Sequence, residues 1–219
     1  MSDIVVVGSV TPTRRTADDG YISPRALRDG TLVTVPLYDA LAMEGRIFTA
    51  TMGSVTTPLT FLATAANRPD AWIRVPTSTT ILPISVTVAL EAFAGTVTEI
   101  DVRIADNDIG SGTSSAATAG PLTNRASSTA VTSACTARQL ATADTTAETN
   151  PRTIWRKTIP TASAAGNDIA GSFTVTRDMM GYPVLYGPST WEVFIAATTT
   201  QATGFVVMQW AELPSTFFQ

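Results

Sequence analysis

The sequence predicts an all-β fold, an antiparallel jelly-roll sandwich with an extended N-terminal arm. Along most of the chain, apolar residues alternate with polar or small ones, as they do on the two faces of a strand. Turn signals rich in Gly and Pro separate these runs, and sustained helical spacing is almost absent. We find no internal repeat, which disfavours propellers and solenoids.

The arm comprises residues 1–30, and the β domain comprises residues 31–219. The arm has a brief β-like run at Ile4–Val7, then charges of both signs and no sustained period. A disordered tail is the alternative, but a purely solvated tail would not need its apolar residues. The arm residues that we expect at an interface with a partner are Arg14, Arg15, Tyr21, Ile22, Arg25, Leu27 and Arg28.

Between residues 31 and 75 the pattern predicts three strands and one short helix. TLVTVP and RIFTATM are strand-like, and Trp72–Val75 is the third candidate. Between the first two, LYDALAMEG can form one or two helical turns before Gly45 ends them.

The clearest alternation lies in TILPISVTVAL and VTEIDVRIA, which predict two half-buried strands. In the first, Pro83 cannot donate a hydrogen bond to a neighbouring strand, so we expect an edge strand or a bulge. In the second, Glu99, Asp101 and Arg103 form the face predicted to be solvated. The residues predicted to be buried are Leu82, Ile84, Val86, Val88, Leu90, Ile100, Val102 and Ile104.

Residues 106–150 are mostly Ser, Thr, Ala and Gly. We expect a long surface excursion, with Ala130–Thr132 as the best candidate for a short strand. Further strands are predicted in TIWRKTIP and at Ser172–Thr176.

The C-terminal part contains two β-prone runs, Thr190–Ala197 and Gly204–Leu213, joined by TTTQAT. Their proximity predicts a β-hairpin. In the second run Val206, Met208 and Trp210 share one face, which we expect to be core.

Phe205 and Val207 lie on the opposite face of the second run, which is too apolar for open water. That face needs a cover, either from this chain or from another copy of it. We therefore add both residues to the interface candidates and expect a homo-oligomer, with a three-fold ring as the preferred symmetry.

Charge and length of apolar runs exclude some partners. Eighteen acids against fourteen bases give a net charge of -4, with no basic run, so we expect no nucleic acid partner. No apolar run approaches the roughly 20 residues that span a bilayer, and no signal peptide is recognised, so we expect synthesis in the cytoplasm and no membrane partner. The single cysteine, Cys135, cannot form an internal disulfide, and its role stays open.

The sequence lacks residues that the common catalytic sites require. The chain has no histidine, which removes the usual catalytic triads and zinc sites. We therefore expect no catalysis and no cofactor. Asp106 and Asp108 could ligate a metal, but the spacing of a calcium-binding EF-hand fails, so a plain turn is the better explanation.

Aromatic residues of the C-terminal part could line a carbohydrate platform, although such residues at strand spacing are more often core. The six residues concerned are Tyr182, Tyr186, Trp191, Phe194, Phe205 and Trp210.

Short segments resemble virion proteins of tailed bacteriophages. At the C-terminus these are Gly187–Pro188 and the run from Gly204–Phe205 through Trp210–Pro214; nearer the N-terminus they are Arg28–Gly30 and Glu44–Arg46, each before a β run. The resemblance implies a non-enzymatic virion protein, a jelly-roll cement or decoration protein whose trimers sit on a shell of phage major capsid protein. Alternatives are a single-jelly-roll major capsid protein, a tail, collar or fibre component, and a glycan-binding adhesin.

Overall fold

The computed structural model describes residues 25–26, 32–33, 36–62, 68–92, 97–110, 114–124, 131–141, 146–159, 171–197 and 201–214. Within these ranges, no helix is long and apolar enough to cross a membrane.

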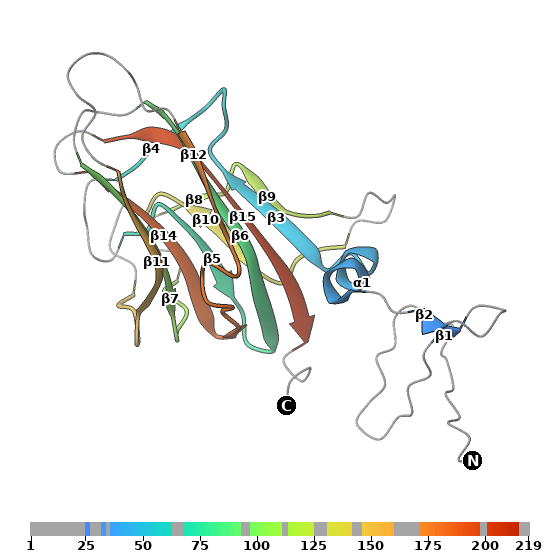
Figure 1. Ribbon diagram of the computed structural model, residues 1–219. Coiled ribbons are helices and arrows are strands. Elements are labelled where there is room, and N and C mark those ends of the chain that lie inside the picture. Colours follow the sequence, from blue (N-terminus) through green and yellow to red (C-terminus); the bar gives the residue numbers. More distant parts are fainter. Residues whose placement is uncertain are drawn as a thin grey trace.

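Two antiparallel sheets pack face to face (Figure 1), so the all-β sandwich that the sequence predicts is confirmed. The seven-stranded sheet has the order β12 (Gly171–Thr176), β6 (Thr79–Ala92), β15 (Thr203–Pro214), β3 (Ile47–Met52) and β9 (Ala119–Thr123), with β13 (Leu185–Tyr186) beside β6 and β4 (Leu59–Thr60) beside β15. The six-stranded sheet has the order β11 (Arg152–Ile159), β7 (Thr98–Ala105), β14 (Ser189–Ala197), β5 (Ala71–Val75), β10 (Thr136–Gln139) and β8 (Ser115–Ala116).

The core between the sheets is built from the inward faces of the long strands. Trp191 on β14 and Trp210 on β15 are both fully buried. Trp210 stacks on Phe48 of β3, with 6.2 Å between ring centroids. Val206 and Met208 are also 0% exposed. The predicted core face of the last strand is therefore confirmed.

The predicted C-terminal hairpin is wrong, because β14 and β15 lie in different sheets. β14 pairs with β5 and β7, whereas β15 pairs with β3 and β6. Packed sheets lie roughly 10 Å apart, and a link of five residues spans up to about 16 Å. The link after Ala197 is thus long enough either to turn back within one sheet or to cross to the other, and the sequence pattern does not distinguish the two.

Strand β6 is central, between β12 and β15, so the prediction that Pro83 marks an edge strand is wrong. The alternative, a bulge, is confirmed. The register with β15 shifts between the pairs Gln209–Ser85 and Trp210–Pro83, which leaves Ile84 as the extra residue. Pro83 sits where the regular ladder is already interrupted, so its missing N–H is tolerated.

The excursion at residues 106–150 contributes strands to the free edges of both sheets. β9 extends the seven-stranded sheet beyond β3, and β10 and β8 extend the six-stranded sheet beyond β5. The strand predicted at Ala130–Thr132 is not formed by Val131 and Thr132, and Ala130 lies outside the described residues. The true strands here are short and rich in small residues, so they carry no strong alternation.

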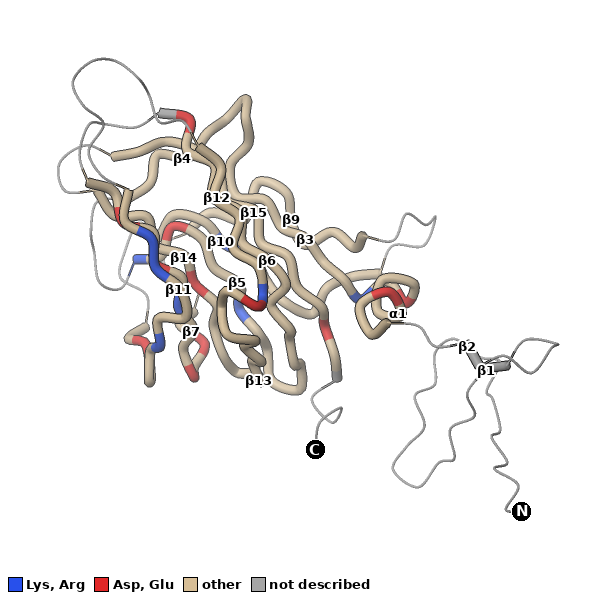
Figure 2. Tube along the Cα trace, in the orientation of Figure 1, with Lys and Arg blue, Asp and Glu red and all other residues tan. Residues whose placement is uncertain are grey.

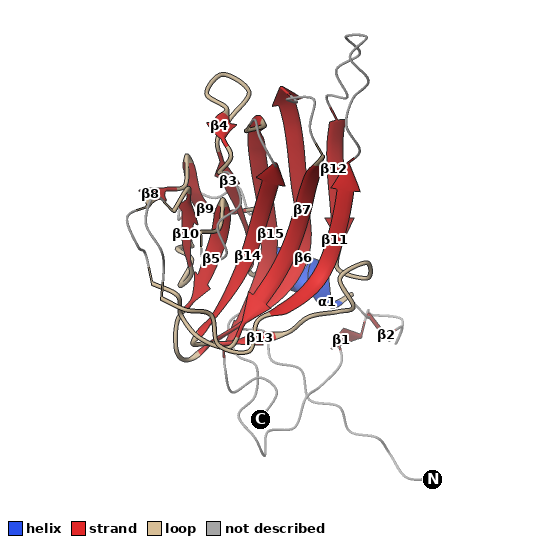
Figure 3. Ribbon diagram, turned by 90° about the vertical axis from the view of Figure 1, so that its left-hand side faces the viewer, coloured by secondary structure: helices blue, strands red, loops and turns tan. Residues whose placement is uncertain are grey.

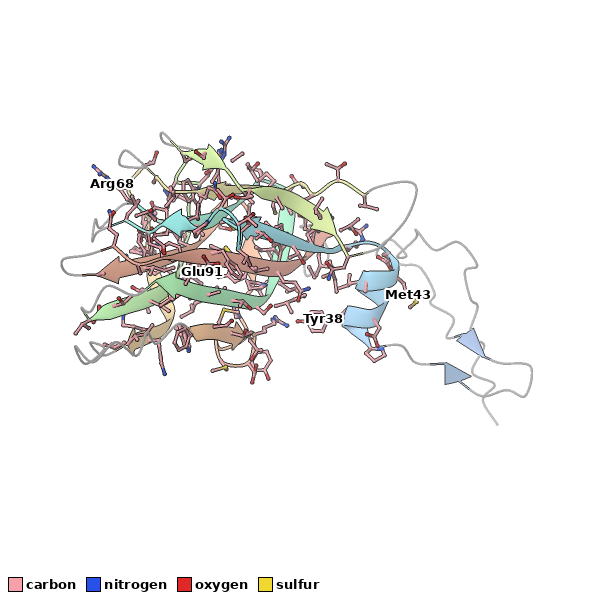
Figure 4. All side chains as sticks on the ribbon, turned by 90° about the horizontal axis from the view of Figure 1, so that it is seen from above. Tyr38, Met43, Arg68 and Glu91 are labelled. Carbon is pink, nitrogen blue, oxygen red and sulfur yellow. The ribbon has the colours of Figure 1, made fainter. Side chains whose placement is uncertain are left out.

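The short helix predicted before Gly45 is present as α1 (Leu37–Met43), and Gly45 follows it with a φ of 73°. Tyr38 points toward the sheets and Met43 away from them (Figure 4). Leu41 is buried in an apolar cluster on the outer side of the seven-stranded sheet, together with Ile47, Leu82, Ala211 and Leu213. The helix therefore covers one end of the apolar outer face of β15.

Little of the predicted N-terminal arm is described. β1 (Arg25–Ala26) pairs with β2 (Leu32–Val33), and this pair spans the boundary predicted at residue 30. The side chain of Arg25 and the other arm candidates, Arg14, Arg15, Tyr21, Ile22, Leu27 and Arg28, lie outside the described part of the chain.

A buried carboxylate fastens the segment 131–135 to the end of β15. Glu212 accepts hydrogen bonds from the Trp210 indole Nε1 and the Ala134 backbone N, each at 3.0 Å, and from the Ser133 hydroxyl. Cys135 lies next in the chain with its thiol buried, and burial raises the pKa of that thiol. Cys135 is therefore a packed, unreactive thiol.

We expect Trp210→Ala to lower the free energy of unfolding by about 3–5 kcal/mol, as other large-to-small core substitutions do. Trp155→Ala is the matched control, because Trp155 is only partly buried, and its cost should be smaller. Urea titration of both variants checks this. A cost for Trp210→Ala no greater than that of the control would contradict the assigned core.

Glu212→Gln should cost about 1–3 kcal/mol, because an amide NH₂ group replaces an acceptor that faces buried donors. It should also speed the reaction of Cys135 with a thiol reagent under native conditions, since the covering segment is less firmly held. Labelling rates that match those of the unsubstituted protein would show that Glu212 does not hold this segment.

Candidate interaction face

The outer face of the seven-stranded sheet has a central area without charged side chains, which we call the uncharged face. Residues that pair across neighbouring strands share a face, and Phe205 and Val207 point away from the core. Following the register outward from these two gives the remaining members among the described residues: Gln209, Ser85, Thr87, Ala89, Ser172, Thr174, Thr176, Thr49, Thr51 and Leu122. In Figure 2 the middle of these strands is accordingly tan.

Hydroxyl and amide groups bond to one another across the strands of this face. The Thr87 and Thr174 hydroxyls lie 3.0 Å apart, which links β6 to β12. Gln209 Nε2 donates to Thr49 Oγ1 at 3.5 Å, and Thr49 Oγ1 donates to Asn124 Oδ1 at 3.0 Å. These polar groups are thereby partly satisfied within the sheet, which lowers the cost of covering them with another uncharged surface.

The apolar part of the face is accessible. Phe205 and Val207, both predicted as interface residues, are half-buried at the centre of the sheet. Leu122 on the edge strand β9 is 63% exposed. At one end the uncharged face meets the apolar cluster around Leu41 of α1. The charged residues Arg177 and Asp178 follow directly after β12.

The six-stranded sheet faces the viewer in Figure 3, and charged residues lie along its strands (Figure 2). Asp101, predicted to be solvated, is 5% exposed and accepts from Arg103 Nε at 2.6 Å and Arg156 Nη2 at 2.9 Å. That prediction is wrong because Arg103 on the same strand and Thr153 and Arg156 of the neighbouring β11 surround the carboxylate. Glu99 on the same strand is exposed, as predicted.

The two candidate metal ligands, Asp106 and Asp108, each form an ion pair with a different arginine. Asp108 receives Arg74 Nε at 2.7 Å and Nη2 at 2.5 Å, and this pair lowers the pKa of Asp108. Asp106 binds Arg152. Asp108 Oδ1 also accepts from Gly110 N at 2.8 Å, the turn that the sequence favours over a metal site. The described residues contain no group of three acidic, cysteine or histidine side chains placed to hold a metal ion.

The six aromatic residues considered for a carbohydrate platform do not form one surface. Trp191 and Trp210 are core, and Phe194 is 7% exposed with the Arg103 guanidinium 4.5 Å from its ring centre. Phe205 is half-buried on the uncharged face. Tyr182 and Tyr186 remain, at 64% and 50% exposed, on the segment between β12 and β14. Arg177 lies over the Tyr182 ring at 5.6 Å.

Sequence reasoning placed Phe205 and Val207 correctly but missed most of the uncharged face. Its threonines and serines come from three strands, β3, β6 and β12, that are far apart in the chain. The signal that could have identified them is the lack of charge at alternate positions of several strands. No protein-family model, curated protein or solved structure matches this chain.

Proposed function

We propose that this chain is a non-enzymatic structural protein of a tailed-bacteriophage virion, a cement or decoration protein that forms homotrimers on the capsid shell. The proposal takes its source from the resemblance of short segments to phage virion proteins. The observation that carries it in the folded chain is the strand order of the two sheets.

The strand order supports a jelly roll. We number the strands β3, β5, β6, β7, β11, β12, β14 and β15 from one to eight in chain order. The seven-stranded sheet then contains the order 1-8-3-6 and the six-stranded sheet the order 2-7-4-5. Two Greek keys rolled together have this arrangement, and jelly rolls occur in viral capsid and lectin domains. One fold can serve many functions, so the proposed function also depends on the surface of the protein.

The uncharged face is the proposed contact between subunits. It has an apolar centre at Phe205 and Val207, and its hydroxyl groups already bond to one another. Burying such a surface removes no charged group from water, and removing charged groups from water is expensive. Closed symmetry allows every copy in a ring to cover this face.

The arm, residues 1–30, is the proposed anchor to the major capsid protein. Its arginines and acids alternate with a few apolar residues, so it gains order by lying along another subunit. The β1–β2 pair lies beyond α1, on the far side of the helix from the sheets (Figure 1). Two further virion roles, a single-jelly-roll capsid protein and a tail, collar or fibre component, are separated from this one by locating the protein in virions with cryo-microscopy.

A glycan-binding adhesin is the second candidate function, favoured by the exposed rings of Tyr182 and Tyr186 beside Arg177. Aromatic rings stack on sugar faces, and a guanidinium donates to sugar hydroxyls. A glycan array with the intact protein tests this, with Tyr182→Ala as the matched variant. Binding that the variant loses would favour this function over the structural one.

We expect light scattering of the intact protein to give three times the mass of one chain, and Val207→Arg to give a monomer. The substitution puts a charge at the centre of the proposed contact, where it cannot be solvated. Thr158→Arg is the control, because Thr158 is exposed on the other sheet. A monomeric unsubstituted protein, or a trimer that persists in a folded Val207→Arg variant, would contradict the proposed contact.

Truncation to begin at Thr31 should leave the melting temperature nearly unchanged and abolish attachment to virions. The control is the full-length chain with Arg14→Ser and Arg15→Ser, which keeps the length and should attach more weakly. Normal decoration by the truncated protein would mean that the arm is passive. Unfolding on truncation would mean that the arm belongs to the sandwich.

A further inference from the structure

A cluster of carboxyl groups and arginines lies between the six-stranded sheet and the excursion that covers it. Glu192 on β14 is 0% exposed and points outward, opposite Arg103 of β7 and Trp72 of β5. Glu148 comes from the excursion, and its side chain is 6% exposed. Asp101 completes the set. These three carboxyl groups are the only ones in the described chain that share this buried position.

The carboxyl groups of Glu192 and Glu148 are neighbours beside Arg103, and they lack ordinary donors. Neither oxygen of Glu192 has a hydrogen-bond donor among the described residues, nor does Oε1 of Glu148. Arg103 Nη1 lies 3.8 Å from Glu148 Oε1, which is an ionic contact rather than a hydrogen bond. Two neighbouring carboxylates, with no donor between them, cannot both stay ionised in a buried site.

The charge balance of the cluster indicates whether a proton or a cation lies between Glu148 and Glu192. Asp101, Glu148 and Glu192 face two guanidinium groups, Arg103 and Arg156, so the ionised cluster would carry one excess negative charge. One proton removes that excess, whereas a divalent cation would reverse it. The described residues also hold no group of three metal ligands. A buried net charge is costly, so the neutral arrangement is favoured.

The other charged groups on this face do not change the balance. Two are self-contained pairs, Arg74 with Asp108 and Arg152 with Asp106. Glu99 of β7 is exposed, and Arg138 of β10 is separated from Glu192 by Trp72.

The excursion segment that carries Glu148 is tied to the start of the excursion. Asp106 N donates to Thr149 O at 2.9 Å, and Thr146 N donates to Ile109 O at 3.0 Å. Ile109 and Ala141 in turn cover the fully buried Trp72. The two ends of the excursion therefore form one unit on the sheet, and Glu148 is the residue of that unit that neighbours Glu192.

We propose that Glu148 and Glu192 share one proton, and that this proton is a latch that fastens the excursion to the six-stranded sheet. Glu192 donates through its carboxylic O–H and Glu148 accepts. Loss of the proton leaves two neighbouring carboxylates, and their repulsion lifts the excursion and opens the cover over Trp72. Burial, and then the charge of Glu148, raises the pKa of Glu192 to about 9, and burial also raises the pKa of Glu148.

The direction of the pH dependence follows from that shift. The folded protein keeps a proton on Glu192 that the unfolded chain has lost above the ordinary carboxyl pKa of 4.5. Stability from this group is therefore full below pH 4.5 and falls as the pH rises to about 9. Burial raises the pKa of Asp70 to about 7, with the same direction, and raises the pKa of the Cys135 thiol above its ordinary 9.0, so the range from pH 7 to pH 9 isolates Glu192.

The test is the melting temperature and the acrylamide quenching of tryptophan fluorescence in the intact protein, measured from pH 7 to pH 10. We expect a falling melting temperature and rising quenching, with a midpoint near pH 9 for the opening. Glu192→Gln mimics the protonated form and should remove both changes. Glu99→Gln removes an exposed carboxyl group of the same face and should keep both changes.

Two results would overturn the latch. The first is a Glu192→Gln variant that folds and still shows the transition of the unsubstituted protein. The second is a rise in melting temperature with calcium chloride at pH 7 in the unsubstituted protein but not in Glu192→Gln, because the pair would then hold a cation rather than a proton. If Glu192→Gln fails to fold, Glu148→Gln replaces it, because it removes the repulsion: the rise in quenching should be lost, although the burial of Glu192 still lowers the melting temperature as the pH rises.

Discussion

The last two strands of the chain lie in different sheets and face each other across the core, and the positions of the other strands follow from this arrangement. Trp191 and Trp210 occupy the two inner faces and are fully buried. Since β14 and β15 cannot pair with each other, each is completed by strands distant in the sequence: β15 by β3 and β6, β14 by β5 and β7. Both sheets therefore depend on the C-terminal strands β14 and β15. Such long-range pairings slow folding, because they must close long loops before they gain contacts.

The two sheets share one core but present different exteriors. One sheet has charged groups on its outer face, where Asp101 has two arginine partners and little contact with water, and the excursion packs over part of that face at Trp72. Within the described ranges, the other sheet is covered only at the end where α1 packs. Its middle keeps hydroxyl groups and a few apolar side chains at the surface. The asymmetry comes from where the connections run and not from the strands themselves.

The positions of most strands could be predicted from the sequence, because alternation reflects the two faces of a strand directly. Trp210 and its neighbours were assigned to the core on that basis, and Gly45 was correctly read as the end of a helix. Pairing partners could not be predicted, as the false hairpin shows, because a short link is compatible with two arrangements.

Burial of charged groups was also beyond the sequence pattern. Asp101 and Glu192 alternate with apolar residues, as solvated residues do. Their burial comes from segments distant in the chain, β11 beside Asp101 and the excursion beside Glu192. The reverse holds for the serines and threonines of the uncharged face. They are unremarkable one at a time and form a surface only when five strands are aligned.

The edge position of β9 affects whether another chain can pair with this sheet. The outermost strand of a sheet has unpaired backbone groups on which another chain can add a strand. β9 occupies that place beside β3, and its central residue Pro121 has no N–H to offer. An incoming strand would find an incomplete ladder there. The excursion therefore acts as a guard against edge-to-edge aggregation, and a shorter chain without it would expose the full backbone edge of β3.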